Sequence, residues 1–240
     1  MASEYHKWIA RNEKPEEKRQ LTKEEKWKNW WYYHKWHVVI AAAAVLLVVF
    51  MVSDVLTGLQ NEPDYQLAYV GYSSLPEDTV TALQNALAAM GEDLNGNGKV
   101  NVVVNQYVFS EEALAYESNQ AAQIQMMVDA TNCSSFIFLM EKPAEFQQNF
   151  ELLAYPDGTE PPMNAQPDEA LWYAWTDCPV LTGLELGGYS KVVLQETITG
   201  DNQQLLSGLY IARRIAPMNG FDTMEENIAF WEKLTAGAVK

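Results

Sequence analysis

The sequence predicts an α/β protein with one N-terminal transmembrane helix and a three-layer domain whose sheet is mostly parallel, with a C-terminal antiparallel addition. Three observations lead to this fold class. Residues 38–52 read VVIAAAAVLLVVFMV, without a charge, Gly or Pro. From residue 64 onward, short apolar runs alternate with segments of helical periodicity. The run Phe136–Met140 is continuously apolar, which is typical of a strand buried on both faces of a parallel sheet.

The apolar run predicts a single-pass membrane anchor. It is shorter than the roughly 20 residues that cross a bilayer, and the segment from Tyr33 to Leu56 supplies the missing length. Residues 27–37 hold four Trp and two Tyr interleaved with Lys, as at a lipid headgroup interface. A cleaved signal peptide and a buried helix of a cytosolic protein are the alternatives. The long leader and the lack of a small-x-small cleavage site favour an uncleaved anchor.

Charge is distributed unevenly about the anchor and predicts its orientation. Residues 1–37 contain nine Lys and Arg against six Glu, whereas residues 53–240 contain seven against 26 Asp and Glu. Because short basic flanks stay in the cytoplasm, we expect the N-terminus inside the cell membrane and the large domain outside. The expected parts are a charged cytoplasmic tail (1–28), an aromatic interface and transmembrane helix (29–56), a linker (57–63) and an extracellular α/β domain (64–240). So acidic a domain disfavours nucleic acid as a partner.

The first half of the domain is predicted to contain three strand–helix pairs, with strands over residues 65–70, 100–104 and 136–140. The first helix follows a capping box, Ser74-x-x-Glu77. The second runs from Ser110 to about residue 131 and is expected to bury Ile124, Met127 and Val128. The third begins at Lys142-Pro143.

The second half is predicted to be less regular. Five prolines fall between residues 154 and 188, so we expect a long irregular segment there. Two strands follow, around residues 191–199 and 208–216, which a turn at 199–202 would join as an antiparallel pair. A last helix should begin at Thr223-x-x-Glu226.

The segment Asp93-Leu-Asn95-Gly-Asn97-Gly-Lys99 is similar to the calcium loop of EF-hands and dockerins. The side chains of Asp93, Asn95 and Asn97 and the carbonyl of Lys99 are the predicted ligands, and Gly98 would permit the sharp turn. The twelfth position is Val104 instead of a bidentate Glu. The alternative is a Gly/Asn turn between a helix and a strand. Ca²⁺ is therefore the one cofactor that the sequence suggests.

Two cysteines, Cys133 and Cys178, lie in the domain. An oxidising compartment would permit a disulfide between them. The alternative is that both are small buried side chains.

A ligand site is predicted beyond the carboxyl ends of the strands, where open α/β sheets bind ligands. Tyr72 and Tyr107 would stack on the ligand, while Ser73 and Ser74, at a helix N-terminus, would bind an anionic group. Alternatively, Ser74 caps the helix and the tyrosines pack. Further candidates for the same cleft are Glu141 and Trp175.

Composition argues against most catalysis in the domain. All three histidines, His6, His34 and His37, precede the apolar run. Triads with Ser or Cys nucleophiles and histidine-ligated zinc are therefore excluded there. No Walker loop or G-x-G-x-x-G occurs. Only a carboxylate-based hydrolase remains as an enzyme, and no spacing singles out an acid pair.

Residues 65–153, with a strand ending at Gly71-Tyr72 and the buried strand Phe136–Met140, resemble the first lobe of type II extracytoplasmic solute-binding proteins. The segment Lys26–His37 resembles that of single-pass membrane proteins of Gram-positive bacteria. The first resemblance implies a strand order of 2-1-3 and a ligand at the strand ends. Residues 154–240 are short for a second lobe.

We therefore expect a membrane-anchored, non-catalytic binding domain of the solute-binding type, with the bilayer and a small molecule as partners. The alternative is an assembly subunit that contacts another membrane or envelope protein and binds no small molecule.

Overall fold

The structure is a computed structural model that describes residues 20–60, 62–110, 116–193, 196–217 and 221–239. The chain forms two compact units, residues 1–57 and 58–240. Residues 1–19 of the predicted tail lie outside the described residues.

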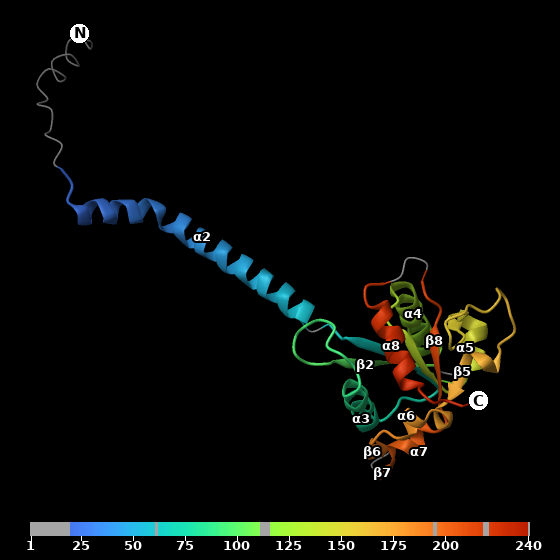
Figure 1. The fold of residues 1–240 in the computed structure, drawn as a ribbon. Helices are drawn as coiled ribbons and strands as arrows, with labels where there is room; N and C mark the ends of the chain where they lie inside the picture. The colour runs from blue at the N-terminus through green and yellow to red at the C-terminus, as the bar shows by residue number, and fades with distance from the viewer. Residues whose placement is uncertain (1–19, 61, 111–115, 194–195, 218–220, 240) are drawn as a thin grey trace, which may run out of the picture. The chain divides into compact units, whose positions relative to one another are not determined.

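One helix, α2 (Lys23–Gln60), contains the whole aromatic and apolar segment (Figure 1). A capping box that the sequence analysis missed opens it. The backbone N–H of Thr22 donates to Oε2 of Glu25 at 2.9 Å, and the N–H of Glu25 donates to Oγ1 of Thr22 at 3.3 Å. The helix thus begins inside the predicted tail and continues into the predicted linker.

The length and composition of α2 suit a membrane span. Residues Lys23–Asp54 are long and apolar enough to cross a bilayer, with a mean hydropathy of 2.5, and other described parts of the chain do not bury this window. Near its start, Trp30 stacks on Trp27 and on His34, with ring centroids 5.2 and 5.0 Å apart. These aromatic contacts follow from helical spacing, which brings residues three and four apart onto one face.

The second unit is built on a six-stranded sheet of order β2-β1-β3-β8-β4, in which β5 also pairs with β8. The strands are β1 (Tyr65–Gly71), β2 (Val102–Val108), β3 (Ile137–Met140), β4 (Leu153–Ala154), β5 (Trp172–Ala174) and β8 (Tyr210–Arg214). The expected order 2-1-3 is confirmed, with β2 and β3 both parallel to β1. The expected mostly parallel sheet is wrong. The sheet is mixed because β8 enters beside β3 and runs antiparallel to β3, β4 and β5.

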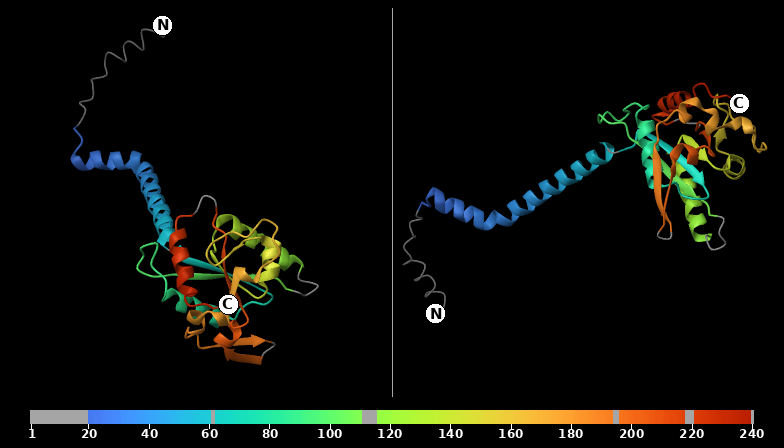
Figure 2. Two further views of the ribbon diagram at one scale, coloured as in Figure 1. Left: turned by 45° about the vertical axis from the view of Figure 1, so that its right-hand side comes forward. Right: turned by 90° about the horizontal axis from the view of Figure 1, so that it is seen from below.

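Two apolar clusters, one on each face of the sheet, make the unit a three-layer sandwich (Figure 2). Successive side chains of β1 alternate between them: Leu67 and Tyr69 belong to one, Ala68 and Val70 to the other. The first cluster includes side chains of α3 (Glu77–Ala88) and α8 (Met224–Leu234). The second includes side chains of α4 (Tyr116–Asn132) and α5 (Pro143–Phe150).

Helix α4 turns a different face to the sheet from the one expected. Its buried residues are Ala122, Met126 and Asp129, whereas the exposed ones include Ile124, Met127 and Val128. Periodicity identified an apolar stripe, but the face toward the sheet carries the polar Asp129. Its carboxylate is satisfied internally by Tyr107 and Ser135.

The C-terminal strands also differ from expectation. In place of the one predicted strand 191–199 the structure has parts of two, β6 (Gly188–Val193) and β7 (Glu196–Asp201). They pair antiparallel as a hairpin that forms a separate two-stranded sheet. The predicted strand 208–216 is β8 and pairs with β3 instead of the hairpin. Besides β5, only short elements lie between β4 and β6: η1 (Glu169–Leu171), η2 (Trp175–Asp177) and α6 (Pro179–Thr182). Helix α7 (Asn202–Leu206) follows β7.

Candidate functional site

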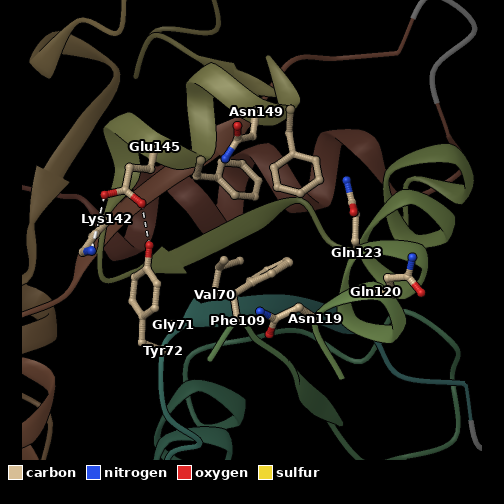
Figure 3. Close-up of a pocket in the computed structure, with 12 residues that line it drawn as sticks. Val70, Gly71, Tyr72, Phe109, Asn119, Gln120, Gln123, Lys142, Glu145 and Asn149 are labelled. Carbon is tan, nitrogen blue, oxygen red and sulfur yellow. Dashed lines mark hydrogen bonds and ion pairs between the residues drawn. The ribbon is translucent and has the colours of Figure 1, made fainter. Parts of the chain in front are cut away.

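A cavity of about 380 Å³ lies at the carboxyl ends of β1, β2 and β3 (Figure 3). In parallel sheets this edge is open because the following helices start there and diverge. Its walls come from the end of β1, the residue after β2, the first two turns of α4, Lys142 before α5, and α5 along its length. The lining residues are Val70, Gly71, Tyr72, Phe109, Asn119, Gln120, Gln123, Lys142, Glu145, Phe146, Asn149 and Phe150.

Aromatic rings form one wall of the cavity. The Phe150 ring lies 5.0 Å from that of Phe146 and 6.3 Å from that of Phe109, between ring centroids. Phe146 in turn packs on Phe138 of β3 at 5.0 Å. This contact with the core fixes the wall, because a buried ring in a packed cluster has little freedom to move.

One cation and one anion stand beside this wall and neutralise each other. The Nζ of Lys142 lies 3.4 Å from Oε1 of Glu145 and 4.1 Å from the centroid of the Tyr72 ring. The Tyr72 hydroxyl donates to Oε2 of Glu145. That hydrogen bond lowers the pKa of Glu145, while partial burial and then the same bond raise the pKa of Tyr72. An exposed pair of this kind adds little stability, so its main effect is to leave this part of the cavity without net charge.

Side-chain amides supply the remaining polar surface. The side-chain amide of Asn119 is already hydrogen-bonded within the protein. Its Nδ2 donates to the Ser110 carbonyl and its Oδ1 accepts from the Ser110 N–H, both at 2.8 Å. In the part of the chain that the structure describes, the amides of Gln123 and Asn149 have no such partner, and both residues are exposed. They are free to donate to and accept from a ligand.

The backbone at the end of β1 is held by Glu141. Its Oε2 accepts from the N–H of Tyr72 at 3.1 Å, and its Oε1 accepts from the hydroxyl of Tyr69 at 2.6 Å. The Tyr69 hydroxyl also lies 2.8 Å from the carbonyl of Ser73. Burial, and then the Glu141 contact, raise the pKa of Tyr69. Glu141 therefore positions Tyr72, which lines the cavity, and does not itself line it.

The predicted ligand residues are divided among several places. Tyr72 lines the cavity described above. Ser73, Ser74 and Glu141 instead line a smaller hollow of about 220 Å³ near Leu205. Pro76, not Ser74, occupies the N-cap of α3, so the predicted capping box is wrong there.

Tyr107 and Trp175 are core residues. The Tyr107 hydroxyl donates to Oδ2 of Asp129 at 2.6 Å, and its burial, followed by this contact, raises its pKa. Trp175 is 1% exposed and its Nε1 donates to Gln203 at 2.9 Å. Neither side chain lines the cavity, so the predicted stacking on Tyr107 is replaced by the packed phenylalanines.

In the predicted calcium loop, backbone N–H groups of the loop itself donate hydrogen bonds to the side-chain oxygens of the predicted ligands. The Asp93 carboxylate accepts from the N–H groups of Gly96, Asn97 and Gly98, at 2.8, 3.2 and 2.7 Å. Asn95 and Asn97 each accept from an N–H two residues further on, the latter from Lys99. Within the described residues, no group of three or more His, Cys, Asp or Glu is arranged to hold a metal ion. The carboxylate and amide oxygens still converge on one loop, and calcium binding there stays a prediction.

Both cysteines are free thiols in the structure, so the predicted disulfide is not formed here. Cys178 is fully buried in the cluster that contains Trp175. Burial, and then the nearby Asp177, raise the pKa of its thiol to about 11. Cys133 is half-buried just beyond the end of α4.

Sequence reasoning missed most of the cavity lining, namely Phe109, Gln120, Gln123, Lys142, Glu145, Phe146, Asn149 and Phe150. The available signal was position: all of them follow the carboxyl end of β2 or β3 within about four helical turns. No family model, curated protein or solved structure matches the chain.

Proposed function

We propose that this protein is a membrane-anchored, non-catalytic binding protein that takes a small uncharged ligand in the cavity between β1, α4 and α5. The observation that supports this proposal best is the lining of the cavity. It combines a packed aromatic wall, the side-chain amides of Gln123 and Asn149 without a hydrogen-bond partner among the described residues, and a Lys142–Glu145 ion pair with no net charge. A ligand with an apolar face and several hydroxyl or amide groups complements such a surface. The cavity volume of about 380 Å³ is of the order of small-molecule sites.

The charge pair argues for an uncharged ligand. An anion would compete with Glu145 for Lys142, and a cation would compete with Lys142 for Glu145, so either would break an existing contact. A neutral polar ligand leaves both in place and pairs with the free amides. Leaving these amides unpaired against the wrong ligand would cost affinity, which gives the site its specificity.

The anchor and its sidedness complete the proposal. Helix α2 is long and apolar enough to span a bilayer. The excess of Lys and Arg in residues 1–37, before the apolar run, favours a cytoplasmic N-terminus and a binding domain outside the cell. A tethered extracellular domain would hold its ligand at the membrane surface.

A thermal-shift screen of the full chain in detergent micelles tests the proposal. Its arms are neutral mono- and disaccharides, N-acetylated and C-amidated amino acids, and uncharged dipeptides, with sodium glutamate and lysine hydrochloride as charged arms. We expect one neutral class to raise the melting temperature in a saturable way. No shift in any neutral arm, or a shift only with the charged compounds, would overturn it.

The second candidate function is an assembly subunit that contacts another membrane or envelope protein. The exposed apolar face of α4 favours a protein contact of some kind.

A further inference from the structure

Helix α4 exposes an apolar stripe. Ile124, Met127 and Val128 are 62, 58 and 53% exposed, and their spacing of three and four residues places them on one face. They line a shallow apolar hollow of about 250 Å³ together with Thr131 and Asn132. Exposed apolar groups gathered in this way mark an interaction surface more often than single exposed side chains do.

The sheet ends beside this stripe in an unprotected edge strand. Among the described residues, β2 pairs on one side only, with β1. Its seven residues, VVVNQYV, contain no charge and no proline. Most edge strands are blunted by charge, proline or shortness, and β4, at the other end of the sheet, has only two residues. Within the described ranges, the outer edge of β2 is thus open to another strand.

The open edge and the apolar stripe adjoin each other. A groove of about 380 Å³ is lined on one side by Asn105 and Tyr107 of β2 and on the other by Ile124 and Val128 of α4. An occupant of this surface can therefore pair with the strand and pack on the helix at once. We call the surface formed by β2 and residues 124–131 of α4 the β2–α4 face.

The distribution of charge on the domain limits which partner can bind the β2–α4 face. Residues 102–108 and 118–128 carry no charged side chain, although residues 53–240 hold 26 acids against seven bases. Asp129, at the end of this stretch, is buried and bonded to Tyr107 and Ser135. The β2–α4 face is therefore a neutral surface on an acidic domain. Two copies can approach through it without bringing their charges together, which like-charged domains cannot do elsewhere without a Coulomb cost.

We propose that a second copy of this chain covers the β2–α4 face, related by a twofold axis. The edge strands would pair antiparallel and extend the sheet across the dimer, as an isologous interface requires. Helix α4 contacts β2, and its Met126 belongs to the same apolar cluster as Ala68 and Val70 of the neighbouring strand β1. With strands about 4.8 Å apart, the two α4 helices would then lie about 10 Å apart, a normal helix-packing distance. Strand pairing and helix packing thus fit one arrangement.

Sedimentation equilibrium of the full chain in density-matched detergent tests this proposal, at 50 and 500 mM NaCl. We expect a monomer–dimer equilibrium that salt strengthens, because screening reduces repulsion between the acidic flanks. Met127→Glu and Ile124→Glu place like charges at the interface and should weaken dimerisation at least about tenfold. Both side chains are exposed, so the variants should fold. Val192→Glu, on the exposed hairpin at 69% exposure, is the matched control and should dimerise as wild type.

Hydrogen exchange separates this interface from the alternatives. The outward N–H groups of β2 should be protected in the wild-type dimer and exchange in Met127→Glu. A monomeric wild type at every concentration would overturn the proposal. A dimer that Met127→Glu leaves intact would also overturn it and would assign the contact to the anchor helix. Protection of α4 that appears only in lipid discs, without dimer, would assign the surface to lipid and likewise overturn it.

Discussion

Gly71 and Tyr69 are packed so closely that position 71 has no room for a side chain. A Cβ there would lie 2.6 Å from Oε1 of Glu141 and closer still to the Tyr69 hydroxyl. The absence of a side chain at Gly71 lets Glu141 reach both the hydroxyl of Tyr69 and the backbone of Tyr72. The shape of the cavity at the end of β1 depends on this contact.

Gly71→Ala should therefore destabilise the domain by about 2 kcal/mol, the usual range for overpacking a filled site. Urea unfolding of the full chain in detergent would measure it. Gly208→Ala is the matched control, because a Cβ at Gly208 meets nothing within 4 Å. If the two variants unfold at the same urea concentration, the close packing of Gly71 is not as described.

The Asp93 loop gives a second prediction. Asp93→Ala removes the acceptor of three backbone N–H groups and should cost about 1–2 kcal/mol. If the loop also binds calcium as its sequence predicts, EDTA lowers the wild-type melting temperature and Ca²⁺ restores it, whereas Asp93→Ala responds to neither. Identical wild-type melts with and without chelator would remove the metal and leave a hydrogen-bonded turn.

The buried thiol of Cys178 predicts a loss of stability in alkali. Its pKa is raised from 9.0 to about 11 in the folded chain, so the folded state favours the protonated thiol. Its contribution is full below pH 9 and is lost as the pH rises from 9 toward 11. Urea unfolding at pH 7 to 11 should show a steeper alkaline decline for wild type than for Cys178→Ala. Cys133→Ala, the control, should follow wild type; equal slopes for Cys178→Ala and wild type would contradict the burial argument.

The orientation of the anchor can be tested in cells. Protease added to intact cells should digest the domain after residue 60 and leave an N-terminal tag intact, because the basic flank holds the N-terminus inside. Permeabilised cells are the control, in which the tag is also lost. A domain that survives in intact cells but not in permeabilised ones would reverse the proposed sidedness.

The sequence predicted the alternating half of the fold best. Each strand from β1 to β3 is a short apolar run followed by a helix start, and these are local signals. The place of β8 could not be predicted, because its pairing with β3 joins residues about 70 positions apart and depends on no local pattern. The sequence predicts one strand where the structure has the hairpin β6–β7, because both strands are rich in β-branched residues.

Helix α4 shows why the candidate site is harder to predict from the sequence than the fold. The sequence shows its apolar stripe, but the face toward the sheet carries Asp129, whose hydrogen bonds to Tyr107 and Ser135 are tertiary contacts. That choice of face also placed Gln123 at the cavity. Tyr72 was predicted from its place after β1. The phenylalanine wall could not be predicted as a whole. Phe146 and Phe150 share one face of α5 through their spacing of four residues, but the contact of Phe150 with Phe109, the residue after β2, is tertiary.

Calorimetric titration of matched α5 variants tests the binding proposal most directly. Asn149 and Gln148 are adjacent exposed amides on α5, but only Asn149 lines the cavity. For the neutral compound that shifts the melting temperature most, Asn149→Ala should weaken binding about tenfold, the loss of one or two hydrogen bonds. Gln148→Ala should bind as wild type. Equal affinity for all three proteins would place the ligand elsewhere and contradict the proposed site.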